Sequence, residues 1–259
     1  MEPYADDLRR AADEAIALLS TLPDDSWDVK AHNLEWSCRE TAAHLDDDLV
    51  AYAMQLSGSS PPQDRYVDFL ESGPWREGGP RLLLYPNPAA GTVGLTACLD
   101  AAAGVLCSVV STVPPERRGY HTFGNSDASG FAAMGTVELV LHTFDILTAH
   151  GIAYRPEDDI TRRVLARLFP WERAGADQTD SAQNDSAQNG TDPTGTEQTG
   201  TDPTGTEQTR TQWTGTGRAV TEQSGTEQLD TDPWTVLLRA TGRTPETRGI
   251  TWRWDSSVR

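Results

Sequence analysis

The stretch MGTVELVLHTFDIL, Met134–Leu147, carries three titratable side chains in an otherwise apolar run. Glu138, His142 and Asp145 are spaced i, i+4 and i+7, so a helix places all three on one face. Because most of the remaining positions are apolar, we expect the helix to be buried on all sides, with its polar face toward the interior. Buried carboxylates and imidazoles need partners. The partner is a metal, another side chain or water.

Composition excludes several classes of function. The chain has 259 residues, with 39 acidic against 21 basic side chains and a net charge of −18. This balance argues against nucleic acid and anionic membrane surfaces as partners, because both require clustered cations. We expect no membrane span, and the acidic start MEPYADDLRR is unlike a secretory signal. The three cysteines, Cys38, Cys98 and Cys107, are an odd number without metal-type spacing. A reduced, cytoplasmic compartment is therefore expected.

Apolar periodicity predicts four helices, at residues 4–21, 38–56, 93–112 and 128–150. The second begins after Ser37-x-x-Glu40, which has the pattern of a capping box. Residues 58–91 are rich in Gly, Pro and Ser and are expected to form an irregular connection. Four helices with one or two long connections predict a mainly α fold, a four-helix bundle over residues 1–155.

The remaining chain is divided by a repetitive tract at residues 174–231. The decapeptide GTDPTGTEQT occurs at 190–199 and again at 200–209. Because the tract has almost no apolar residues, we predict a disordered insertion. On either side of it, residues 156–173 and 232–259 predict helices at 157–169 and 233–241 and a strand, ITWRW, at 250–254. These elements suggest a small C-terminal α/β domain.

A metal site would need a ligand from a second helix, and His44 is the histidine in the middle of one. His44, Glu138 and His142 would provide three ligands and leave a position open for water or substrate, as in a catalytic site. On spacing alone, however, a Glu-x-x-x-His pair more often belongs to the surface or to a satisfied core.

Other polar residues near these positions also have two interpretations. The acidic run Asp46-Asp47-Asp48 suggests a solvated face, with one member free to orient His44. Asp145 either orients His142 or caps a loop. Cys38 is either an inert buried thiol or a thiolate favoured at a helix start. A hydrolytic triad has no elbow motif to support it.

Two segments carry a family resemblance: EWSCRETAAHLDDDLVAYA at 35–53 and FGNSDASGFAAMGTVELVLHTFDILTAHG at 123–151. They resemble the N-terminal domain of the mycothiol-dependent maleylpyruvate isomerases, DinB-like four-helix metalloproteins of actinobacteria. The segments LFPW at 168–171, DPWTVLLRATGR at 232–243 and WRW at 252–254 resemble the C-terminal region of that family.

The resemblance implies particular site residues. It implies a divalent metal, typically zinc, held by His44, Glu138 and His142. It also implies that an arginine of the C-terminal domain assists the substrate, with Arg243 as the first candidate and Arg239 as the second. The alternative for Arg243 is a turn residue that packs against Trp252 or Trp254. Asp145 is the second residue expected to serve catalysis.

The resemblance further implies mycothiol as cosubstrate, and we expect an S-transferase-type enzyme in which the metal activates the thiol to attack an electrophile. The expected partners are therefore a small thiol and a small electrophile, and the identity of the electrophile is left open. Three alternatives remain. They are a cis–trans isomerase of the maleylpyruvate type, a non-haem iron oxygenase with the same ligand set, and a non-catalytic bundle that binds a metal or ligand and acts through a partner.

Overall fold

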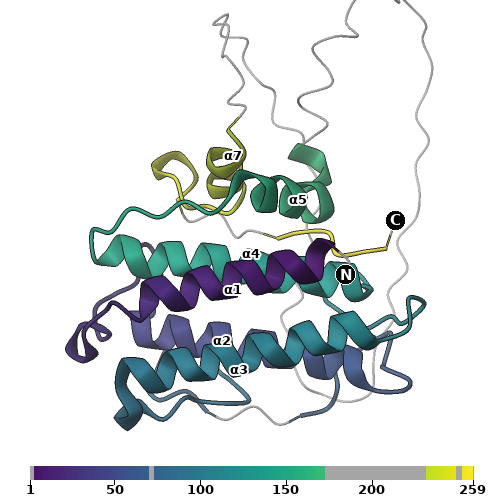
Figure 1. Ribbon diagram of the computed structural model, residues 1–259, viewed down its shortest axis with the longest axis horizontal. Helices are drawn as coiled ribbons and strands as arrows, with labels where there is room; N and C mark the ends of the chain where they lie inside the picture. Colours follow the sequence, from purple (N-terminus) through teal and green to yellow (C-terminus); the bar gives the residue numbers. More distant parts are fainter. Residues whose placement is uncertain (1–2, 70–72, 173–231, 249–252, 259) are drawn as a thin grey trace, which may run out of the picture.

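Four long helices form the main body of the computed structural model, which describes residues 3–69, 73–172, 232–248 and 253–258 (Figure 1). They are α1 (Pro3–Leu19), α2 (Cys38–Ser57), α3 (Gly91–Thr112) and α4 (Ala128–Ala149). Helix α1 packs on α3 and α4, and α2 packs on the same two helices from the other side. The predicted mainly α, DinB-like bundle is confirmed, and each helix ends within about two residues of its expected position.

Side-chain caps begin the two helices that carry the titratable residues. The predicted capping box is present in α2, where Ser37 accepts from the Glu40 N–H and the Ser37 N–H donates to the Glu40 carboxylate. Helix α4 begins at Asp127, whose side chain accepts from the Gly130 N–H. These bonds satisfy backbone donors that a helix start otherwise leaves free. They also determine where each helix begins, and hence which residues face its neighbours.

Helix α4 is buried on almost all sides because other helices surround it. Helices α1, α2 and α3 pack on it from one side, and α5 (Asp158–Leu168) packs on it from the other (Figure 1). By length and composition alone both α4 and the segment Pro88–Thr112 could cross a membrane, which is weak evidence because the core helix of a bundle passes the same test. The most apolar window of α4 is 94% buried, as in the core helix of a bundle, against 39% for the segment containing α3. Gly135 allows close packing in the middle of α4, where a Cβ would lie 2.7 Å from Leu106.

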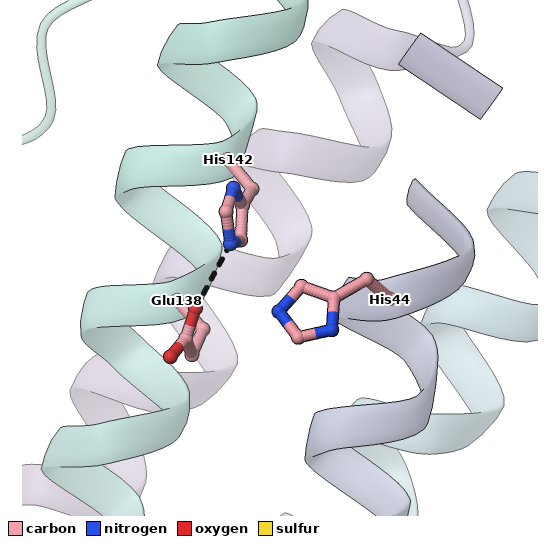
Figure 2. Close-up of side chains that lie close together, drawn as sticks. All are labelled: His44, Glu138 and His142. Atoms are coloured by element: carbon pink, nitrogen blue, oxygen red, sulfur yellow. Dashed lines mark ion pairs between the residues drawn. The ribbon is translucent and has the colours of Figure 1, made fainter. Parts of the chain in front are cut away.

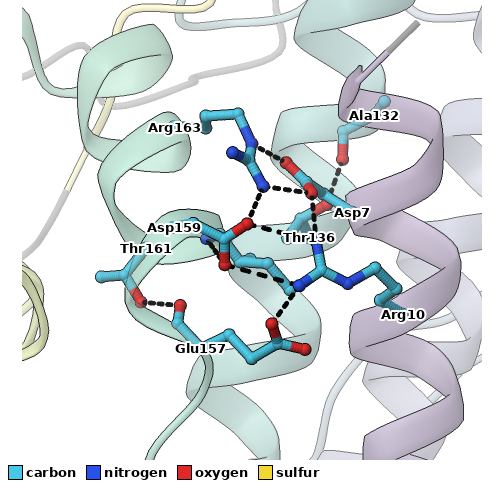
Figure 3. Close-up of polar contacts among 9 residues, drawn as sticks. Asp7, Arg10, Ala132, Thr136, Glu157, Asp159, Thr161 and Arg163 are labelled. Atoms are coloured by element: carbon cyan, nitrogen blue, oxygen red, sulfur yellow. Dashed lines mark hydrogen bonds and ion pairs between the residues drawn. The ribbon is translucent and has the colours of Figure 1, made fainter.

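A network of ion pairs attaches α5 to α1 (Figure 3). The buried carboxylate of Asp7 accepts from Arg163 at 2.5 and 2.7 Å, and Arg163 also pairs with Asp159. Arg10 bridges Asp7, Asp159 and Glu157 from the α1 side. Asp7 is thereby compensated by two guanidinium groups, which is the condition under which a carboxylate can be buried.

The C-terminal segments pack on the bundle. Helix α7 (Pro233–Ala240) places Trp234 edge-on against Phe144 of α4, with ring centroids 5.6 Å apart. Near the C-terminus, the Ser256 N–H donates to the carbonyl of Phe123 at 3.0 Å. The three short 3₁₀ segments of the described chain are Asp24–Ser26, Pro88–Ala90 and Pro245–Thr247.

The predicted α/β character of the C-terminal region is not confirmed. Both expected helices are present, but the described residues contain no strand. Of the expected strand 250–254, residues 250–252 lie outside the described part, and Arg253 and Trp254 are irregular. The repetitive tract, residues 174–231, also lies outside the described part. The division into domains stays a prediction.

Candidate metal centre

Two helices bring three potential metal ligands together. Helix α2 contributes His44, and α4 contributes Glu138 and His142 one turn apart (Figure 2). One ligand atom from each lies within 4.8 Å of the other two. Glu138 and His142 are each only 4% exposed. These are the three residues expected from spacing and from the resemblance, and the fold brings them to one place.

The Glu138 carboxylate is incompletely satisfied. Its Oε2 lies 3.0 Å from His142 Nε2, but the pair lacks the alignment of a hydrogen bond, and Oε2 has no hydrogen-bond partner among the described residues. The Tyr52 hydroxyl donates to Oε1 at the long distance of 3.5 Å. Two ligand atoms on one tetrahedral zinc ion lie roughly 3.3 Å apart. A buried oxygen with no donor, this close to an imidazole nitrogen, fits a cation between them.

Asp145 and Arg243 form a chain of polar contacts that begins at Nδ1 of His142. Its Nδ1 lies 3.1 Å from Asp145 Oδ2, and the Arg243 guanidinium donates to Asp145 at 3.0, 3.2 and 2.7 Å. Arg243 also donates to the Thr241 carbonyl at 3.1 Å. Because Asp145 accepts from Nδ1, the ring presents Nε2 toward Glu138 and His44, the arrangement by which proteins orient a metal-ligating histidine.

These contacts set the protonation of the site. Burial alone would lower the pKa of His142, but the hydrogen bond with Asp145 and the negative charges of Glu138 and Asp145 outweigh it and raise the pKa to about 9. Burial, with the nearby His142, lowers the pKa of His44 to about 4. Burial opposes the ionisation of Asp145, yet Arg243 and His142 hold its pKa below the usual range. His44 is therefore neutral near pH 7, and a cation bound at His142 would take the place of a proton.

The expectation that the acidic run forms a solvated face is wrong. Asp46 and Asp47 are 5% and 6% exposed, because the connection after α2 and helix α3 cover this side of the helix. Asp47 accepts from the N–H groups of Leu83 and Leu84, both at 2.8 Å. Asp48 Oδ2 lies 3.3 Å from His44 Nε2, so one member of the run does contact His44, as expected.

A cavity of about 380 Å³ opens beside His44. Asp48, Tyr52 and His121 contribute to its wall, together with Tyr66 from the connection after α2. Tyr52 and His121 were not among the site residues expected from the sequence. The signal for Tyr52 was present, since His44, Asp48 and Tyr52 repeat every four residues along one face of α2. His121 lies in a loop and offered no such signal.

The remaining candidates are placed as follows. Arg243 is buried against Asp145. This contact was expected neither for a substrate-binding arginine nor for a turn residue that packs against a tryptophan. Trp252 lies outside the described residues. Arg239 is exposed on α7. Cys38 is buried with Sγ 4.0 Å from the carbonyl of Ile146, and burial raises the pKa of its thiol to about 11. That pKa favours the inert thiol over a reactive thiolate.

Comparison with known families adds to this geometry. The family model of the mycothiol maleylpyruvate isomerase N-terminal domain matches residues 8–147, more than half of the chain. The chain belongs to this family. The matched residues begin in α1 and end in α4, so the mycothiol maleylpyruvate isomerase N-terminal domain corresponds to the bundle. Searches of curated proteins and of solved structures find no significant match.

Proposed function

We propose that the protein is a mycothiol-dependent S-transferase-type metalloenzyme. The single observation that carries the proposal is the unsatisfied Glu138 Oε2, buried 3.0 Å from His142 Nε2 and facing His44 (Figure 2). Membership of a family named for mycothiol supports the choice of thiol. We place the protein in a reducing, cytoplasmic compartment, in keeping with three unpaired cysteines.

His44, Glu138 and His142 would hold the metal, with two imidazole nitrogens and one carboxylate oxygen. When bound, zinc would supply an open coordination position and lower the pKa of a thiol there, so that a nucleophile forms at neutral pH. Zinc is preferred because it has no redox chemistry and accepts thiolates readily.

The chain's own residues then have separate tasks. Asp145 keeps the Nδ1 proton of His142 in place, and Arg243 keeps Asp145 ionised. Both are positioning residues, since they act through His142. Asp48 contacts His44 and lines the same cavity, where its carboxylate can accept the proton that the thiol loses. The cavity beside His44 would receive the electrophile, with Tyr52 and Tyr66 excluding water around it.

The first test is the metal content of the purified protein by elemental analysis. We expect about one zinc per chain, lost in His44→Ala and Glu138→Ala. His150→Ala is the matched control, because His150 lies at the end of α4 and should leave the metal in place. A wild-type chain without metal after reconstitution would refute the site. It would favour the non-catalytic bundle.

The second test supplies mycothiol and a panel of electrophiles to the zinc-loaded protein. Mass spectrometry distinguishes the outcomes, since conjugation adds the mass of the thiol, whereas isomerisation leaves the substrate mass unchanged. Conjugation that requires both mycothiol and His44 supports the S-transferase. A geometric isomer of unchanged mass would instead identify an isomerase of the maleylpyruvate type.

A further inference from the structure

A second cavity lies on the side of α2 that faces away from the metal centre. Asp46 follows His44 by two residues, which turns its side chain about 200° around the helix. The cavity has a volume of about 300 Å³. Its wall is almost entirely apolar and includes Val50 of α2, Leu84 and Tyr85 of the following connection, and Val105 of α3.

Asp46 is the charged exception in this wall. The side chain is 5% exposed, and neither carboxyl oxygen has a hydrogen-bond partner among the described residues. Its neighbour Asp47 shows the contrast, because Asp47 is occupied by two backbone N–H groups. None of the residues that line the cavity carries a positive charge. A buried carboxyl without a partner opposes folding, so its presence calls for a ligand that satisfies it.

The dimensions restrict where that ligand lies. A smaller cavity of about 10 Å³ also touches Asp46, between α1 and α3, but its volume is that of one water molecule at most. The larger cavity is at the lower limit of small-molecule sites. Its apolar wall suits a hydrocarbon or aromatic body, and the single carboxyl suits a donor with positive charge.

We propose that this cavity is a second ligand site, which binds an organic ammonium ion with a small apolar body and pairs the ammonium group with Asp46. The site is separate from the metal centre and does not depend on the function proposed for it. The apolar part of the ligand lies against Val50 and Val105, and its charged end meets the carboxyl that the protein leaves unpaired.

Cys98 provides a direct readout, because it is exposed and lines the cavity. The full-length chain with Cys107→Ser leaves Cys98 as the accessible thiol, since Cys38 is buried. We would measure the rate at which N-ethylmaleimide alkylates Cys98, with 2-phenylethylammonium as the probe and 2-phenylethanol as its neutral counterpart. At a concentration of roughly ten times Kd, the ammonium probe should slow alkylation about tenfold. The alcohol should have a much weaker effect.

Two variants test the role of the carboxyl. Asp46→Asn should abolish the protection. Asp100→Asn should retain it, because Asp100 lies on α3 near Cys98 but pairs with Arg9 outside the cavity. Asp46→Asn should unfold at a temperature no lower than the wild type, since it removes an unpaired acid. Protection should be equal in zinc-loaded and metal-free protein.

Several results would overturn the proposal. Absence of protection would exclude the ligand class, and equal protection by the alcohol or in Asp46→Asn would exclude the carboxyl. A lower unfolding temperature for Asp46→Asn would show that the carboxyl already has a stabilising partner. If alkylation of Cys98 slows as the protein concentration rises, with no probe present, the cavity is covered by a second copy of the chain.

Discussion

Substitution of Arg243 by methionine tests the contacts behind His142 most directly. The change removes three hydrogen bonds to Asp145 and one to the Thr241 carbonyl. It leaves the Asp145 carboxylate, which is 1% exposed, paired with His142. Removing one member of a buried ion pair typically costs about 3–5 kcal/mol. Because His142 still compensates Asp145, we expect a loss near the lower limit, about 3 kcal/mol.

The assay is urea unfolding of the metal-free protein, followed by far-ultraviolet circular dichroism. Arg162→Met serves as the control, because Arg162 and Asp158 form an exposed pair on α5, 3.7 Å apart, and should contribute under about 0.5 kcal/mol. The double variant Asp145→Leu/Arg243→Met should lose less stability than the sum of its two single variants, since no buried charge is then left without its partner.

Metal affinity gives an independent measure of the same contacts. If Asp145 and Arg243 orient His142, Arg243→Met should weaken zinc binding about 10–100-fold while Arg162→Met leaves it unchanged. The reasoning is refuted if Arg243→Met lowers the unfolding free energy no more than Arg162→Met does and binds zinc like the wild type. Loss of stability with unchanged zinc affinity would restrict Arg243 to a structural role.

Three further predictions test the fold. Gly135→Ala should destabilise the protein by about 1–3 kcal/mol, because its Cβ would lie 2.7 Å from Leu106. Gly104→Ala should stabilise the protein by about 0.5–1 kcal/mol, because a Cβ at Gly104 would have no atom within 4 Å. Equal effects of the two variants in chemical denaturation would contradict the close packing at Gly135. Burial lowers the pKa of His121 to about 4 from an ordinary 6.5, so the unfolded chain binds its proton first as the pH falls. The free energy of unfolding should therefore fall by about 3 kcal/mol between pH 6.5 and pH 4. His121→Phe should remove that part of the pH dependence, and an unchanged slope of stability against pH would refute the prediction. Deletion of residues 176–229 should leave helicity and zinc content unchanged, and loss of either would overturn the proposal that the tract is a tolerated insertion.

Much of the bundle was predictable because its signals are local. Apolar periodicity and the Ser37–Glu40 capping box depend on residues within a few turns of one another, and the structure confirms both. The Glu138–His142 pair was predictable for the same reason, since four residues are about one helical turn. The C-terminal strand was not confirmed. Apolar alternation over five residues is a weak signal when the pairing strand is not specified.

The sequence by itself therefore determined the helices and the polar face of α4. The resemblance and the position of His44 in its helix suggested the third ligand, but only the tertiary structure brings His44 within 4.8 Å of the other two. Asp145 and Arg243 are 98 residues apart, so their contact depends on where α7 and the following turn dock on α4. The burial of Asp46 and Asp47 likewise depends on what covers α2. Such contacts follow from the rotation and register of packed helices, which periodicity along one helix does not encode.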